Sequence, residues 1–199
     1  MQTRIILFAG LLLSLTACIR SAGPLMSEER DVAPFTGIAI TSSADVEIVQ
    51  NEPYEVLVEA PDNLMPFIET EVENGVLEIR ERRNNIWHGD RVRIFVNMDE
   101  LTQASISGSG DLLGRGFTAQ NVNLSISGSG DMDLKMDAAN IKAAISGSGD
   151  MELEGSATNL QFTISGSGDF RGRYCTVDNA DVTISGSGDG FITVTKELD

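Results

Sequence analysis

Hydrophobic and polar residues alternate along most of the chain beyond residue 100. The alternation flanks a recurrent six-residue unit, as in Val122–Ile126 before one copy and Met132–Met136 after it. A period of two is typical of a β-strand that has one buried and one solvated face. The pattern therefore predicts two short strands between successive units, with polar residues such as Asn123 and Asp133 on the outer side.

The six-residue unit, Ile-Ser-Gly-Ser-Gly-Asp, predicts a turn that closes one structural coil. Its copies are 20, 19, 19 and 20 residues apart, and they lie at Ile106–Asp111, Ile126–Asp131, Ile145–Asp150, Ile164–Asp169 and Ile184–Asp189. A degenerate copy, Ile40–Asp45, has small residues in place of both glycines. Because a coil of this length cannot bury its apolar face alone, the repeat predicts a stack of coils. The expected fold is all-β, a parallel β-helix or β-solenoid of 19–20-residue coils.

A column of asparagines accompanies the repeat. The four residues occupy the same place before the first strand of successive coils, and they are Asn121, Asn140, Asn159 and Asn179. In parallel stacking, each side-chain amide could bond to its copy one coil away or cap the local backbone. The column favours parallel coils over the alternative, an antiparallel meander in which each Gly-Ser-Gly would be a hairpin turn.

The first part of the domain, residues 34–100, lacks further copies of the unit but remains rich in strand patterns. We expect irregular opening coils that form an N-terminal β cap, followed by regular repeats over residues 101–199. Asn74-Gly75 between two apolar runs predicts a two-residue hairpin. Asp62–Glu69 could form a short helix or loop that covers the open end.

The recurrent unit has a structural and a functional interpretation. Its glycines would permit a positive φ in a tight corner, and its aspartate would cap free amides of the turn. Stacking would also place like charges about 4.8 Å apart, which a calcium ion could relieve. The aspartates of this candidate metal site are Asp111, Asp131, Asp150, Asp169 and Asp189. The turn resembles the Gly-Gly-x-Gly-x-Asp calcium repeat only in part, because that repeat has a period of about nine residues.

The sequence contains few residues that favour catalysis. His88 is the one histidine and follows Trp87 in a polar loop, so no histidine cluster for a metal or a catalytic triad exists. The two residues are instead a candidate binding loop.

Two arginines that interrupt the repeat mark a second candidate site. Arg171 and Arg173 lie beside Asp150 and Asp169, and some β-helix proteins use carboxylates with arginine to act on acidic polysaccharides. The alternative function is therefore a glycan-active β-helix enzyme.

The N-terminus predicts export. A charge at Arg4, an apolar run over residues 5–15 and small residues before Cys18 indicate a signal peptide over residues 1–17. The pattern resembles a bacterial lipobox, in which Cys18 would be acylated, and the alternative is an ordinary secretory peptide cut nearby. Residues 18–33 would form a flexible tether. Because Ile19 is not aspartate, enteric sorting rules favour the outer membrane, with the domain facing either the periplasm or the cell surface.

With Cys18 acylated, Cys175 is the remaining cysteine, and we expect it to be buried. The formal net charge of -16 disfavours nucleic acid as a partner and favours cations or basic surfaces.

The whole domain is similar to a known family of bacterial lipoproteins. The matching residues are Phe35–Ile38, Ser43–Ile48, Glu69–Ile79 and the five Ser-Gly-Ser-Gly-Asp turns. They resemble the putative auto-transporter adhesin, head GIN domain family. The resemblance implies an exported, tethered β-helical domain, and the family's name implies adhesion. It supplies no catalytic residues.

The last coil is expected to be truncated, because Lys196–Asp199 stands where its next core strand should begin. Its open edge would invite end-to-end association, or the sequence is a fragment.

Together these features predict a lipid-anchored surface module that binds or scaffolds and does not catalyse. Its expected partners are the membrane, through the lipid, and an extracellular protein or glycan. A calcium-binding envelope protein is a further alternative, and calcium is the one cofactor considered.

Overall fold

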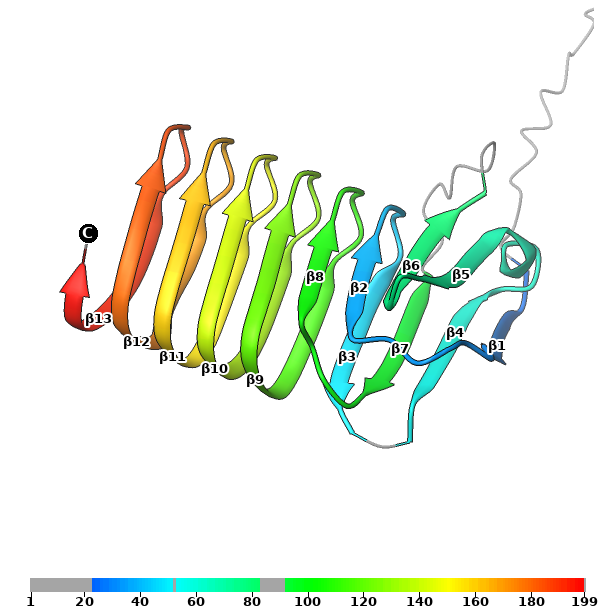
Figure 1. Cartoon of the computed structure of the whole chain (residues 1–199). Coiled ribbons are helices and arrows are strands. Elements are labelled where there is room, and N and C mark those ends of the chain that lie inside the picture. Colours follow the sequence, from blue (N-terminus) through cyan, green and yellow to red (C-terminus); the bar gives the residue numbers. More distant parts are fainter. Residues whose placement is uncertain (1–22, 52, 83–91, 199) are drawn as a thin grey trace, which may run out of the picture.

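The computed structural model describes residues 23–51, 53–82 and 92–198, and its strands form one 13-stranded sheet that curls into a solenoid (Figure 1). Neighbouring coils of the regular part pair in parallel and in chain order. Its strands are β8 (Gln103–Ile106), β9 (Leu112–Ile126), β10 (Met132–Ile145), β11 (Met151–Ile164), β12 (Phe170–Ile184) and β13 (Gly190–Leu198). The predicted parallel β-helix is therefore confirmed, and the antiparallel meander is wrong.

Each regular coil contains one long bent strand, where the alternation predicted two short ones. Strands β9 to β12 contain 14 or 15 residues each, and they bend at the lower edge of Figure 1 while the six-residue corners lie at the upper edge. Pairing with the next coil continues on both sides of the bend, for example from Met132 opposite Met151 to Ile145 opposite Ile164. The ladder is preserved because stacked coils bend at the same place.

Single-residue bulges explain why some coils have 20 residues and others 19. In β9, Gly116 is inserted between residues that pair with the consecutive Lys135 and Met136, and its φ is 78°. In β12, one extra residue lies between Arg171 and Tyr174, opposite Glu152 and Glu154. A β-bulge adds one residue to one strand and redirects the side chains beside it.

The order of the coils in the stack differs from their order in the chain. Strands β2 (Gly37–Ile40) and β3 (Asp45–Gln50) pair in parallel with β6 (Val76–Glu81) and β7 (Arg93–Met98) on one side. On the other side they pair in parallel with β8 and β9. The corner between β2 and β3 is the degenerate unit, and the Ser107 amide donates to the Ile40 carbonyl at 2.9 Å.

An antiparallel cap covers the N-terminal end of the stack. It contains β1 (Leu25–Glu29), β4 (Glu55–Pro61), β5 (Ile68–Glu73) and a 3-10 turn at Met65–Phe67. The predicted hairpin joins β5 to β6 through Asn74 and Gly75, with φ values of 53° and 79°.

The expected tether is partly structured. Residues 25–29 form β1 and pair with β4, so the expectation of a flexible tether is wrong there. Within the described residues, no helix has the length and apolar character needed to cross a bilayer.

The core is a narrow apolar column between the two sides of the coils. The isoleucine that precedes each corner is at most 1% exposed in five consecutive copies, which are Ile40, Ile106, Ile126, Ile145 and Ile164. Toward the C-terminal end, the rings of Phe162 and Phe170 stack with centroids 4.4 Å apart. The isoleucines therefore lie above one another for most of the stack, and two stacked aromatic rings fill the core at β11 and β12.

Candidate functional site

The corners stack through backbone hydrogen bonds that bring adjacent chains very close. The Ser148 amide donates to the Gly128 carbonyl at 3.0 Å, and the Ser167 amide donates to the Gly147 carbonyl at 2.9 Å. A Cβ on Gly147 would lie 2.0 Å from the Gly128 carbonyl oxygen. None of the corner glycines has a positive φ, so the predicted reason for glycine is wrong. Glycine is required here by the close approach of one corner to the next.

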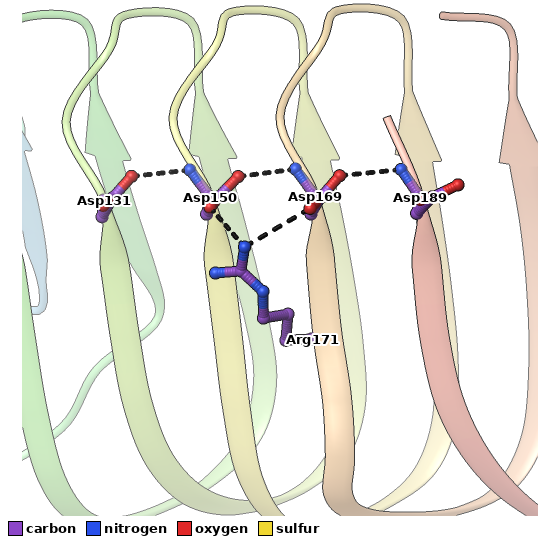
Figure 2. A network of polar contacts seen from close by, with 5 residues as sticks. All are labelled: Asp131, Asp150, Asp169, Arg171 and Asp189. Atoms are coloured by element: carbon purple, nitrogen blue, oxygen red, sulfur yellow. Dashed lines mark hydrogen bonds and ion pairs between the residues drawn. The ribbon is translucent and has the colours of Figure 1, made fainter. Parts of the chain in front are cut away.

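The aspartates of the corners form a hydrogen-bonded column (Figure 2). The Oδ1 of each aspartate from Asp111 to Asp169 accepts a hydrogen bond from the backbone amide of the next aspartate in the stack, at 2.7 to 2.9 Å. The ladder contains all five aspartates, which are Asp111, Asp131, Asp150, Asp169 and Asp189. The prediction that the aspartates cap backbone amides is therefore confirmed. The capped amide belongs to the next coil, so each bond links two neighbouring coils.

Arg171 bridges two members of the aspartate column. Its Nη2 lies 2.7 Å from Oδ2 of Asp150 and 3.3 Å from Oδ2 of Asp169 (Figure 2). Burial opposes the charge on Arg171, but the hydrogen bond to Asp150 and the charges of both aspartates outweigh this and raise its pKa. The guanidinium offsets the repulsion between these two carboxylates.

The described residues contain no group of three or more His, Cys, Asp or Glu side chains placed to hold a metal ion. Calcium takes six to eight oxygen ligands, whereas one oxygen of each aspartate from Asp111 to Asp169 is already bonded to a backbone amide. The geometry of the column therefore gives the expected calcium site no support.

The predicted asparagine ladder is present. Asn140 donates to Asn121 at 2.9 Å, Asn159 donates to Asn140 at 2.8 Å, and Asn179 donates to Asn159 at 3.0 Å. Together with the aspartate column, the ladder holds successive coils in register.

The bulge in β12 places Tyr174 on the outer surface. Arg173 and Tyr174 are consecutive and both exposed, which breaks the alternation of the strand. Strand β13 pairs Ile192 with Gly172 and Thr193 with Thr176, so residues 173–175 fall outside its register, and the Thr193 hydroxyl donates to the Arg173 carbonyl at 3.0 Å. Tyr174 pairs with Glu154 of β11 on one side, and with no β13 residue in register on the other side it is 74% exposed.

Charged side chains and a second aromatic ring surround Tyr174. The Arg173 guanidinium lies 4.3 Å from the centroid of the Phe191 ring. A depression of about 260 Å³ is lined by Glu152, Arg171, Arg173, Tyr174 and Phe191, and a second of about 370 Å³ is lined by Lys135, Glu154, Gly155 and Tyr174. We call these residues the Tyr174 platform.

Sequence reasoning found part of this site. It identified Arg171 and Arg173 beside the aspartates, but it missed Tyr174 and Phe191. The spacing of the repeats contains a signal for the bulge. The distance from Ile164 to Ile184 is one residue longer than the two repeat distances before it. Cys18, Trp87 and His88 lie outside the described residues.

Cys175 is the inward neighbour of Tyr174 and is 1% exposed, as predicted. Burial, followed by the charge of Asp137, raises the pKa of its thiol to about 11.

We expect Cys175 to resist a thiol reagent in the folded protein at about pH 9, where a thiol with the ordinary pKa of about 8.5 would be mostly ionised. The measurement compares labelling rates with and without urea in a chain with Cys18 replaced by alanine. Equal rates in the two conditions would contradict burial.

The comparisons with known proteins agree with this architecture. The family model described as "Putative auto-transporter adhesin, head GIN domain" matches residues 34–199. A putative adhesin from Bacteroides fragilis has 18% identity and a TM-score of 0.80, with 88% of this chain and 93% of that chain covered. No curated protein matches the chain.

Two other solved structures share the fold. A putative lipid binding protein from Parabacteroides distasonis has 21% identity and a TM-score of 0.65, with 88% of this chain and 94% of that chain covered. A putative adhesin from Parabacteroides merdae has 18% identity and a TM-score of 0.64, with 88% and 93% covered. At these identities, the likeness is one of fold.

Proposed function

The chain belongs to the putative auto-transporter adhesin, head GIN domain family, and we propose that it is an exported, lipid-anchored module that binds a ligand at the cell surface. The solenoid is a rigid scaffold whose outer side presents the binding residues. The observation that carries the proposal is the Tyr174 platform, where the backbone holds an exposed aromatic ring among charged groups.

Rigidity supports binding at this position. The ladders on either side fix the backbone of β11 and β12, so little conformational entropy would be lost when the platform meets a ligand. Tyrosine also supplies a large contact area with few rotatable bonds.

The glycan-active enzyme has less support from the same residues. Asp150 and Asp169 both contact the Arg171 guanidinium, and each also accepts a backbone amide hydrogen bond. These contacts assign both carboxylates a structural role in the stack. The family description names an adhesin rather than an enzyme.

The lipid anchor and outer-membrane location rest on the first residues. Cys18 directly follows an apolar run and two small residues, and an acyl chain there would tether the solenoid to the membrane. One acyl chain gives only marginal anchoring, so stable attachment requires a second signal, such as another acyl chain.

The test compares the wild-type chain with Cys18→Ala in cells fed radiolabelled palmitate. We expect label in the wild-type chain and none in the variant, because the variant lacks the acylated thiol. An impermeant amine reagent on intact cells should label the wild-type chain through its exposed lysines. Acylation of the variant would contradict anchoring at Cys18, and labelling only after lysis would contradict surface display.

A further inference from the structure

The Tyr174 platform combines an exposed aromatic ring with charged hydrogen-bonding side chains along two depressions. Resting on the proposed binding function, we propose that it binds an uncharged oligosaccharide, with the Tyr174 ring against the apolar face of one sugar. Arg171 and Arg173 then donate hydrogen bonds to sugar hydroxyls, and Glu152 and Glu154 accept them.

The shape of the platform suits a short linear chain. The two depressions share Tyr174 and lie on residues of β10, β11, β12 and β13. Three strand spacings correspond to about 14 Å along the solenoid axis. The ligand therefore crosses the strands, with one part on each side of the tyrosine ring.

The polar side chains of the Tyr174 platform can pair with the hydroxyl groups of a sugar. A hydroxyl both donates and accepts, a guanidinium only donates, and an ionised carboxylate only accepts. Arg171 uses one nitrogen, Nη2, for its contacts with Asp150 and Asp169, which leaves donors on its other nitrogens. Arginines and glutamates around one aromatic ring supply both kinds of partner within a small area.

The charges favour an uncharged ligand over a polyanion. Of the three basic residues of the platform, Arg171 is bound to two aspartates and Lys135 lies 3.8 Å from Glu154. The third, Arg173, lies over the Phe191 ring. The formal net charge of the whole chain is -16, which repels polyanions.

The same residues disfavour a protein partner. The cores of protein interfaces are enriched in aromatic residues and Arg but depleted in Lys and Glu, and Glu152, Glu154 and Lys135 lie directly around Tyr174. The apolar part is confined to Tyr174 and Phe191, whose exposed fractions are 74% and 38%.

The test measures binding of the full-length chain, purified from membranes in a detergent without a sugar headgroup, to an array of neutral and acidic glycans. We expect binding to neutral oligosaccharides. Tyr174→Ala should weaken it at least about tenfold through lost stacking, while Tyr174→Trp keeps the affinity within about threefold. Lys142→Ala, at an exposed position before a corner, is the matched control and should leave affinity unchanged.

The outcomes separate this site from the proposed function. If Tyr174→Ala does not weaken binding to neutral glycans, the Tyr174 platform is not the glycan site. The proposal that the chain is a ligand-binding module would still stand. Binding restricted to acidic glycans, or to a protein partner, would overturn the ligand class. Because Tyr174 is 74% exposed, an unchanged melting temperature of Tyr174→Ala will distinguish lost contact from lost folding.

Discussion

Gly147→Ala is expected to lower the free energy of unfolding by about 3 kcal/mol, the upper part of the range for overpacked interiors. The added methyl group would lie 2.0 Å from the Gly128 carbonyl oxygen, with two more backbone atoms at 2.8 Å. None of these atoms belongs to a flexible side chain, so the two corners must separate. Separation also weakens the 3.0 Å hydrogen bond from Ser148 to Gly128. Urea unfolding followed by circular dichroism measures the loss.

Ser148→Ala is the matched control for the corner substitution. The Ser148 side chain is exposed, so its loss should change the free energy of unfolding by no more than about 0.5 kcal/mol. Hydrogen exchange should show faster opening of the corners beside residue 147 in Gly147→Ala and no such change in Ser148→Ala. An unfolding midpoint in Gly147→Ala equal to that of Ser148→Ala would contradict the close-approach explanation.

The repeated part of the fold could be predicted because each coil contains its own evidence. The isoleucine, asparagine and aspartate of one coil contact their copies in the next, so a column in the sequence is also a column in space. The N-terminal part has no such columns. The insertion of β2 and β3 between β6–β7 and β8–β9 depends on contacts between unlike segments, which no periodicity reveals.

The candidate site was only partly predictable for a related reason. Arg171 and Arg173 stand out as charges, but the exposure of Tyr174 depends on strand β13, whose register skips residues 173–175. A strand pattern assigns alternate residues to the two faces and does not anticipate a bulge. The six-residue unit is the same in every regular coil and therefore does not identify a site. A bulge such as the one in β12 shows where one coil has a different surface.

The corner aspartates illustrate how local geometry decides between two interpretations. Their spacing alone is compatible with a row of repelling charges or a row of cation ligands. The Oδ1 atoms of Asp111 to Asp169 each accept the next backbone amide at 2.7 to 2.9 Å, so the row caps the corners rather than holding a cation. The remaining repulsion is reduced where Arg171 reaches Asp150 and Asp169.

Phe162→Ala is expected to lower the free energy of unfolding by about 4 kcal/mol, the typical cost of removing a buried aromatic ring. Phe162 is 1% exposed, and its ring stacks on Phe170 with centroids 4.4 Å apart. Phe162→Leu keeps most of the volume and should cost roughly 1.5 kcal/mol. The same urea titration, with hydrogen exchange over β11 and β12, measures both losses, and equal losses for alanine and leucine would contradict a packing role.

Gly190 provides an independent check on the position of that ring. It occupies the inward column of Met132, Met151 and Phe170, and a Cβ there would lie 2.5 Å from Cζ of Phe162. Gly190→Ala should therefore destabilise the wild-type chain by about 1 to 2 kcal/mol and the Phe162→Leu chain by less, because leucine lacks the far end of the ring. A double-mutant cycle measures this coupling. Additive effects would mean that the ring does not lie against Gly190.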